Sequence, residues 1–164
     1  MSQPVATFAG DAVYLDTMVP YALLRNIEGQ AIKALFQRIM TGELPAFTSA
    51  LTFDELAYRL LLAAIRDHYP GNPIDHLRRD ETTLIATHYP PIAAELQRLQ
   101  SFPHLTLLDV TASDIEQMHL FMAEYHLRPR DALHLAAMQK CNCFNLVSRD
   151  ADFDRVPIVH RYTP

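Results

Sequence analysis

The sequence predicts a single α/β domain across residues 1–164, with a mainly parallel central sheet flanked by helices. Short apolar runs alternate with longer segments of helical composition, an order that is typical of parallel sheets. The first run, AVYL (12–15), is wholly apolar, which suits a strand that is buried on both faces. With 164 residues, of which 49% are hydrophobic and 20% charged, the chain is long enough to bury one sizeable core.

We expect a sheet of four to five short strands. The runs are residues 12–15 (AVYL), 45–49 (PAFTS), 105–110 (LTLLDV), 145–148 (NLVS) and, more weakly, 157–160 (PIVH). Each run is only four to six residues long, which is a usual length for a strand and too short for a typical helix.

Helices are expected in the segments between these strands. Thr17 is placed to cap the first of them, after residues 12–15. The later helices are predicted over residues 31–40, 52–66, 74–86 and 92–100, after Thr111 or Ser113, and from Pro129 onward.

Two proline-containing stretches should interrupt the helical pattern. HYPGNP (68–73) ends the helix over 52–66, and HYPP (88–91) ends the one over 74–86. Residues 68–91 are therefore predicted to form an extra helical arm on the domain. Apolar side chains of this region, such as Leu84, Ile85 and Ile92, are candidates for a docking surface.

Four acidic residues are predicted to meet at one edge of the sheet. Asp16 directly follows the run over 12–15, and Asp150 follows the run over 145–148 by one residue. Because helices run antiparallel to the strands, the first turns that are expected to contain Glu55 and Asp131 lie at the same edge. Ligands of such sheets bind beyond the carboxyl ends of the strands.

Each acid, taken alone, also has a structural explanation. Glu55 fits a capping box with Thr52, and it is spaced for a surface ion pair with Arg59. Asp131 would stabilise the positive end of a helix. Asp16 suits a turn, and Asp150 suits an Asx turn. These separate explanations account less well for four acids at the same edge, because clustered carboxylates repel one another. A divalent cation with oxygen ligands, Mg²⁺ or Mn²⁺, would resolve that repulsion.

Four stretches of the sequence, in order, resemble the motifs of PIN domains. They are DTMVPYALL (16–24), TSALTFDELAYRL (48–60), RPRDALHLAAM (128–138) and LVSRDADFDRV (146–156). The most similar group is that of the small toxin ribonucleases of the VapC type. The segment DALHLA, followed later by S-x-D-x-D-F, is the most specific part of the resemblance.

The resemblance implies a metal-dependent endoribonuclease that hydrolyses RNA phosphodiester bonds. It gives Asp16, Glu55, Asp131 and Asp150 the role of a catalytic, metal-binding quartet. Asp152 matches a frequent additional metal-binding acid, and Thr17 and Ser148 match small hydroxyl residues that flank the acids. The resemblance also implies an antitoxin partner and a homodimer. The remaining hypotheses are a housekeeping PIN nuclease and a catalytically silent PIN fold that binds RNA or protein.

Several basic residues bracket the late acids. Arg128, Arg130, Arg149 and Arg155 could hold phosphates of the substrate, or they could simply balance the acidic charge. The net charge of −5 argues against non-specific coating of nucleic acid, which requires a basic surface. It is compatible with an acidic centre that has a small basic rim.

The other features indicate a cytoplasmic protein with no membrane association. No long apolar segment and no export signal is visible, and the pair Cys141 and Cys143 is too small for a disulfide scaffold. The eight histidines lack the spacing of a zinc site. His134 lies three residues after Asp131, where it could steady that acid or could be a packing histidine.

Overall fold

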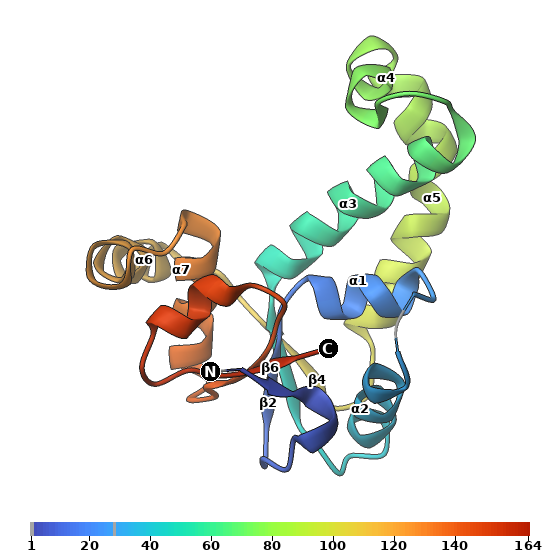
Figure 1. Ribbon diagram of the computed structural model, residues 1–164. Coiled ribbons are helices and arrows are strands. Elements are labelled where there is room, and N and C mark those ends of the chain that lie inside the picture. The colour runs from blue at the N-terminus through green and yellow to red at the C-terminus, as the bar shows by residue number, and fades with distance from the viewer. Residues whose placement is uncertain (1, 28) are drawn as a thin grey trace.

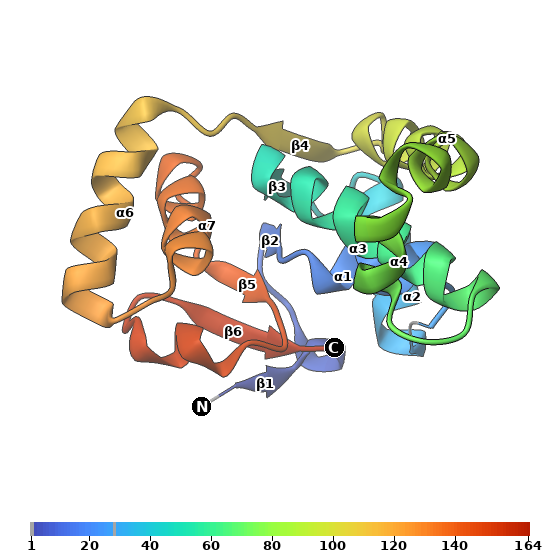
Figure 2. The ribbon, with the colours of Figure 1, turned by 90° about the horizontal axis from the view of Figure 1, so that it is seen from above.

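The computed structural model describes residues 2–27 and 29–164, and it shows a parallel sheet between two layers of helices (Figures 1 and 2). Within these residues the sheet has six strands in the order β1-β6-β5-β2-β3-β4. Every neighbouring pair is parallel. The strands are β1 (Gln3–Pro4), β2 (Val13–Leu15), β3 (Ala46–Ser49), β4 (Leu105–Leu108), β5 (Asn145–Val147) and β6 (His160–Thr163). The predicted α/β class with a parallel sheet is confirmed.

The two edge strands on one side differ from the prediction. The weak fifth strand was expected over 157–160, but β6 begins at His160 and pairs with β5 through residue 162. Val159 lies before the strand and packs against the core, whereas Pro157 and Ile158 are exposed in the turn that precedes it. Strand β1 was not predicted, because its two residues are too few to show a pattern.

The central strand β2 supplies side chains to both layers of the core. Val13 and Leu15 pack with α2 (Gln30–Met40), whereas Tyr14 packs with α7 (Pro129–Lys140). This alternation is the period of two that a strand imposes. Since both faces are covered, the whole strand is apolar, as the sequence predicted.

The helices divide between the two faces of the sheet (Figure 2). On one side lie α6 (Ala112–Tyr125) and α7, which pack together. On the other side lie α1 (Met18–Leu24), α2, α3 (Ala50–His68) and α5 (Glu81–Gln100). None of the described helices is both long and apolar enough to cross a membrane.

A helical arm projects from the second layer (Figure 1). It consists of the outer parts of α3 and α5 and the short helix α4 (Pro73–Arg79) between them. The predicted arm is thus present, but its helices have different boundaries. Helix α5 runs without interruption through Pro90 and Pro91, where a break was expected.

Packing against α3 explains why the prolines do not end α5. Leu84, Ile92 and Leu96 on both sides of the proline pair are buried against Leu60 and its neighbours on α3. Tertiary contacts of this kind outweigh the local cost of proline, which is about 3 kcal/mol in a helix interior. They also bury Leu84 and Ile92, so only Ile85, which is 39% exposed, remains of the three residues expected to form a docking surface.

An ion pair fixes the segment that follows β5. Arg161 on β6 is 8% exposed and donates two hydrogen bonds of 2.8 Å to the Asp154 carboxylate. A third hydrogen bond joins Arg161 to the carbonyl of Ser148. This clamp holds the 3-10 turn η2 (Ala151–Arg155) against the sheet edge, so Asp154 has a structural partner of its own.

Candidate active site

The four predicted acids lie at the carboxyl edge of the sheet. Asp16 follows β2, Asp150 is the N-cap residue of η2 after β5, and Asp131 is in the first turn of α7. Glu55 lies in the second turn of α3, not in the first as expected, because the helix begins at Ala50 after the N-cap residue Ser49.

A cavity of about 880 Å³ opens at this edge. It is lined by Asp16, Thr17, Met18, Glu55, Arg59, Arg128, Pro129, Arg130, Asp131, His134, Arg149, Asp150 and Ala151. All four predicted acids thus border one space, although up to 134 positions separate them in the sequence. Four arginines, Arg59, Arg128, Arg130 and Arg149, line the same cavity, so basic groups border the acidic centre.

Hydrogen bonds orient the Asp16 carboxylate. Its Oδ1 accepts from the backbone N–H of Thr17, and its Oδ2 accepts from the hydroxyl of Ser148, both at 2.6 Å. The Ser148 oxygen in turn accepts from the N–H of Asp150 at 2.9 Å. Ser148 therefore links the acid after β2 to the acid after β5.

Asp150 forms the Asx turn that the sequence suggested. Its Oδ1 accepts from the N–H of Asp152 at 2.8 Å. The turn brings Asp152 beside Asp150, and Asp152 also pairs with Arg155 at 2.8 Å. An Asx turn and a place in the acidic cluster are thus compatible functions of one side chain.

The Glu55 carboxylate is held by two side chains from other elements. Thr17 Oγ1 donates to its Oε2, and Arg130 donates to its Oε1 at 2.8 Å. Burial raises the pKa of Glu55, but these two hydrogen bonds, together with the electrostatic effects of His134 and Arg130, outweigh burial and bring the pKa below its usual value. The predicted capping box is wrong, because Thr52 is buried inside α3 and its hydroxyl accepts from Thr48. Thr17 is the N-cap residue of α1, as expected, but its side chain makes no capping hydrogen bond, because its hydroxyl binds Glu55.

Asp131 lacks such compensation. Its Oδ2 is one of four buried side-chain atoms without a hydrogen-bond partner in the described part of the chain. Burial, followed by the charges of Asp150, Asp16 and Asp152, raises the pKa of Asp131 to about 6. Asp131 therefore carries both the cost of burial and the repulsion that the sequence predicted for clustered carboxylates.

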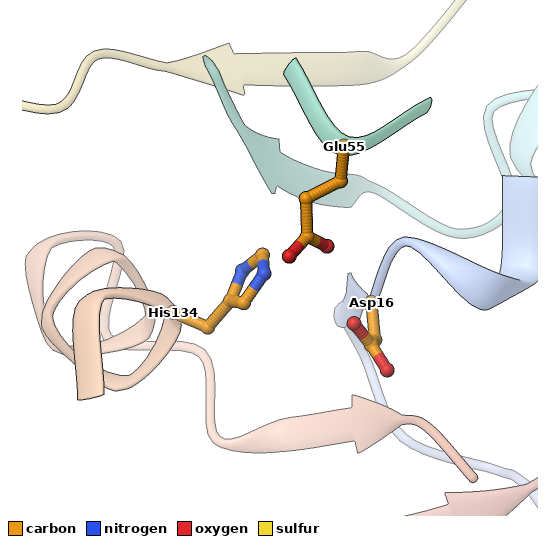
Figure 3. A group of neighbouring side chains, drawn as sticks. All are labelled: Asp16, Glu55 and His134. Atoms are coloured by element: carbon orange, nitrogen blue, oxygen red, sulfur yellow. The ribbon is translucent and has the colours of Figure 1, made fainter. Parts of the chain in front are cut away.

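His134 lies deeper than sequence reasoning indicated. It is 2% exposed, and its Nδ1 is 2.9 Å from the hydroxyl of Tyr14, a fully buried residue on β2. Complete burial lowers the pKa of His134, although Asp16 and Glu55 act to raise it. Figure 3 shows the ring directed from α7 toward Glu55, with Asp16 across from both.

The donor atoms form two neighbouring groups. One contains Asp16, Glu55 and His134, the other Asp131, Asp150 and Asp152, and within each group the donor atoms lie within 4.8 Å of one another. Carboxylate oxygens with an unpartnered buried atom, Asp131 Oδ2, are a donor set suited to Mg²⁺ or Mn²⁺. The chemistry of these donor atoms therefore fits a divalent cation.

The arginines that line the cavity, and Arg155 beside it, differ in their ion pairs. Arg130 binds Glu55 and, at 3.4 Å, Asp54. Arg155 binds Asp152, and Arg128 lies 3.9 Å from the same carboxylate. Arg149 is exposed on the cavity wall and makes no ion pair with any residue that the structure describes.

Sequence reasoning missed two features of the cavity. The spacing of Glu55 and Arg59 allowed a surface pair as one explanation, but Arg59 lines the cavity, and Glu55 pairs with Arg130. Sequence reasoning also left the role of His134 open, because the partner Tyr14 is 120 positions away in the sequence. The apolar spacing of α7 was the available signal, since it places His134 on the buried face.

A comparison with protein families identifies the fold. The family model described as "PIN domain" matches residues 13–159, which is nearly the whole chain and includes every acid of the cavity. This protein belongs to the PIN-domain family. The resemblance stated from the sequence motifs is thereby confirmed.

Solved structures of other PIN-domain proteins share this fold. The VapBC2 complex of Rickettsia felis, crystallised with a DNA fragment from its promoter, has a chain with a TM-score of 0.61 and 14% identity, covering 93% of this chain and 98% of its own. For Mycobacterium tuberculosis VapC20, described as a toxin that cleaves the sarcin–ricin loop, the TM-score is 0.56 and the identity 21%, with 90% and 96% covered. FitAcB of Neisseria gonorrhoeae matches with a TM-score of 0.52 and 16% identity over 92% and 96%. No curated protein matches the chain.

The raised pKa of Asp131 predicts an unusual pH dependence of stability in this PIN domain. An unfolded aspartate ionises near pH 3.9, about 2 units below folded Asp131. The native state therefore loses stability relative to the unfolded chain as the pH rises from about 4 to about 6. Without metal, Asp131→Asn should gain about 1 kcal/mol at pH 7.5, after allowance for partial exposure. Urea unfolding in EDTA measures this gain, which should vanish near pH 4.

Asp154→Asn is the matched control for this experiment. Its hydrogen bonds to Arg161 lower the pKa of Asp154, so its contribution has the opposite sign. That variant should be destabilised at neutral pH, and the loss should shrink as the pH falls through the lowered pKa. If Asp131→Asn instead destabilises the protein at neutral pH, Asp131 is not under charge repulsion.

Proposed function

We propose that this protein is a metal-dependent endoribonuclease that acts in the cytoplasm as the toxin of a toxin–antitoxin pair. The observation that supports this most is the convergence of Asp16, Glu55, Asp131 and Asp150 on one cavity, with Asp131 Oδ2 buried and unpartnered. Membership of the PIN-domain family supports hydrolysis of phosphodiester bonds.

Mg²⁺ or Mn²⁺ is the proposed cofactor, held by the four acids together with Asp152. When bound, a divalent ion lowers the pKa of a coordinated water molecule and stabilises negative charge on the phosphate. The carboxylates cannot approach an RNA phosphate on their own, because like charges repel. These acids would therefore need to hold a divalent ion for an RNA phosphate to bind beside them.

The protein's own groups prepare the site for this task. Thr17 and Ser148 fix the carboxylates of Glu55 and Asp16 by hydrogen bonds, so little reorganisation is needed when a ligand binds. Arg128, Arg130 and Arg149 border the same cavity and can bind phosphate oxygens on either side of the cleaved bond. Water attacks phosphorus, the bond to one ester oxygen breaks, and that oxygen leaves with a proton.

The toxin assignment is supported by the kind of protein that shares the fold. Similar chains come from the VapBC2 and FitAcB complexes and from a toxin–antitoxin complex of Klebsiella pneumoniae. An antitoxin for this chain would insert a basic side chain among the acids, where it competes with metal. A homodimer is part of the proposal. The exposed apolar side chains Tyr69 and Ile85 of the arm, and Tyr58 in the middle of α3, are available to such an interface.

Purified protein should cleave RNA in Mg²⁺ or Mn²⁺ and stop when EDTA is added. A suitable panel combines total cellular RNA with a hairpin that contains the sarcin–ricin loop, since similar VapC20 is described as cleaving that loop. Asp16→Asn should lower the cleavage rate by about 100-fold or more, because it removes a ligand that acts in the transition state. Asp75→Asn, an exposed acid of the arm, is the matched control and should cleave like the parent.

Sequencing the new RNA ends would define the substrate. Intact RNA throughout the panel, with folded protein and either metal present, would favour a catalytically silent PIN fold that binds RNA or protein.

Induced expression of the toxin should arrest growth, and co-expression of the cognate antitoxin should restore it. Asp150→Asn should abolish the arrest while the protein accumulates normally, because harm depends on cleavage. The antitoxin is expected from a short adjacent reading frame and should co-purify with the parent. Normal growth during expression, with no adjacent small reading frame, would leave the housekeeping PIN nuclease as the better assignment.

A further inference from the structure

His134 carries a buried nitrogen without a partner inside the acidic cavity. The side chain is 2% exposed, and its Nε2 makes no hydrogen bond with any residue that the structure describes. Such an atom is expected to find a ligand, because a buried polar group without a partner is destabilising. The cavity that it borders is large enough to admit one.

A contact of the other ring nitrogen, Nδ1, fixes the orientation of the His134 imidazole. Its Nδ1 lies 2.9 Å from the Tyr14 hydroxyl, and Tyr14 is fully buried in the centre of the sheet. With the ring proton on Nδ1, this N–H donates a hydrogen bond to the Tyr14 oxygen, and Nε2 keeps a free lone pair on the other side of the ring. Histidine ligands of metals are usually held by a second-nitrogen contact of this kind.

Two carboxylates face the free nitrogen. A donor atom of His134 and one oxygen each of Asp16 and Glu55 lie within 4.8 Å of one another, and Figure 3 shows the three side chains converging. Every oxygen of the two carboxylates accepts one hydrogen bond, from Thr17, Ser148 or Arg130. Since a carboxylate oxygen can accept two, each retains a lone pair for a further ligand.

We propose that His134 Nε2 is a metal ligand together with Asp16 and Glu55, and that this nitrogen gives the site a preference for Mn²⁺ over Mg²⁺. The proposal rests on the proposed function only in requiring that the cavity binds a divalent cation. Imidazole suits transition metals, whereas Mg²⁺ prefers oxygen ligands almost exclusively. The neighbouring group of Asp131, Asp150 and Asp152 offers oxygen alone, so it has no such preference.

Pulsed electron paramagnetic resonance of Mn²⁺ bound to the full-length protein tests the ligand directly. The parent should show coupling of the ion to a nitrogen nucleus, and the coupling should vanish in His134→Leu. Titration calorimetry should show Mn²⁺ affinity reduced by about tenfold or more in that variant, with Mg²⁺ affinity changed by less than about threefold. Tyr14→Phe keeps the aromatic ring but frees the imidazole, so it should weaken Mn²⁺ binding to an intermediate extent.

His88→Leu is the matched control. His88 is also buried, at 7% exposure, and its Nε2 also lacks a partner, but it lies in the arm on α5. This variant should retain both the nitrogen coupling and the parental ratio of Mn²⁺ to Mg²⁺ affinity. If His134→Leu does not fold, the milder Tyr14→Phe and the spectrum of the parent still decide the question.

The outcomes separate this inference from the nuclease assignment, because none of the readouts requires RNA. Parental protein that binds no Mn²⁺, or binds it without nitrogen coupling, overturns the role of His134 even if RNA is cleaved. A nitrogen coupling that depends on His134 supports that role even if no RNA is cleaved, in which case only the nuclease assignment fails.

Discussion

The mutual repulsion of carboxylates at one sheet edge is the constraint on which this site depends. Parallel topology brings the ends of β2 and β5 and the start of α7 together, so Asp16, Asp150 and Asp131 have no freedom to separate. Hydrogen bonds to Asp16 and an ion pair between Arg130 and Glu55 compensate part of this negative charge. Asp131 receives neither, and burial together with the repulsion from the neighbouring aspartates raises its pKa. A bound cation would complete the compensation.

Most of this arrangement could be predicted from the sequence because it follows from chain direction. An acid directly after a buried parallel strand can lie only at the carboxyl edge, so Asp16 and Asp150 were placed correctly. The position of Asp131 was predicted correctly because Pro129 marks the first turn of a helix. Glu55 was placed at the correct edge but in the wrong turn. The motif Thr52-x-x-Glu55 has the spacing of a capping box, whereas the helix begins two residues before Thr52.

The features that could not be predicted depend on contacts between distant segments. The proline pair in α5 would end an isolated helix, and only burial of Leu84 and Ile92 against α3 keeps the helix continuous. The environment of His134 is set by Tyr14, which no local pattern connects to it. The three late aspartates look alike in sequence, yet Asp154 belongs to a clamp with Arg161 and not to the acidic cavity.

The central claim, that four acids form one metal site, is tested most directly by thermal unfolding with and without Mn²⁺. Only metal bound to the native state raises the melting temperature, by about 2.7 kcal/mol in stability at 100 times the Kd and so by about 5–10 °C. The parent should show this rise, and Asp16→Asn, Glu55→Gln, Asp131→Asn and Asp150→Asn should each lose most of it while remaining folded. A clear rise in the parent that all four variants retain would contradict the account.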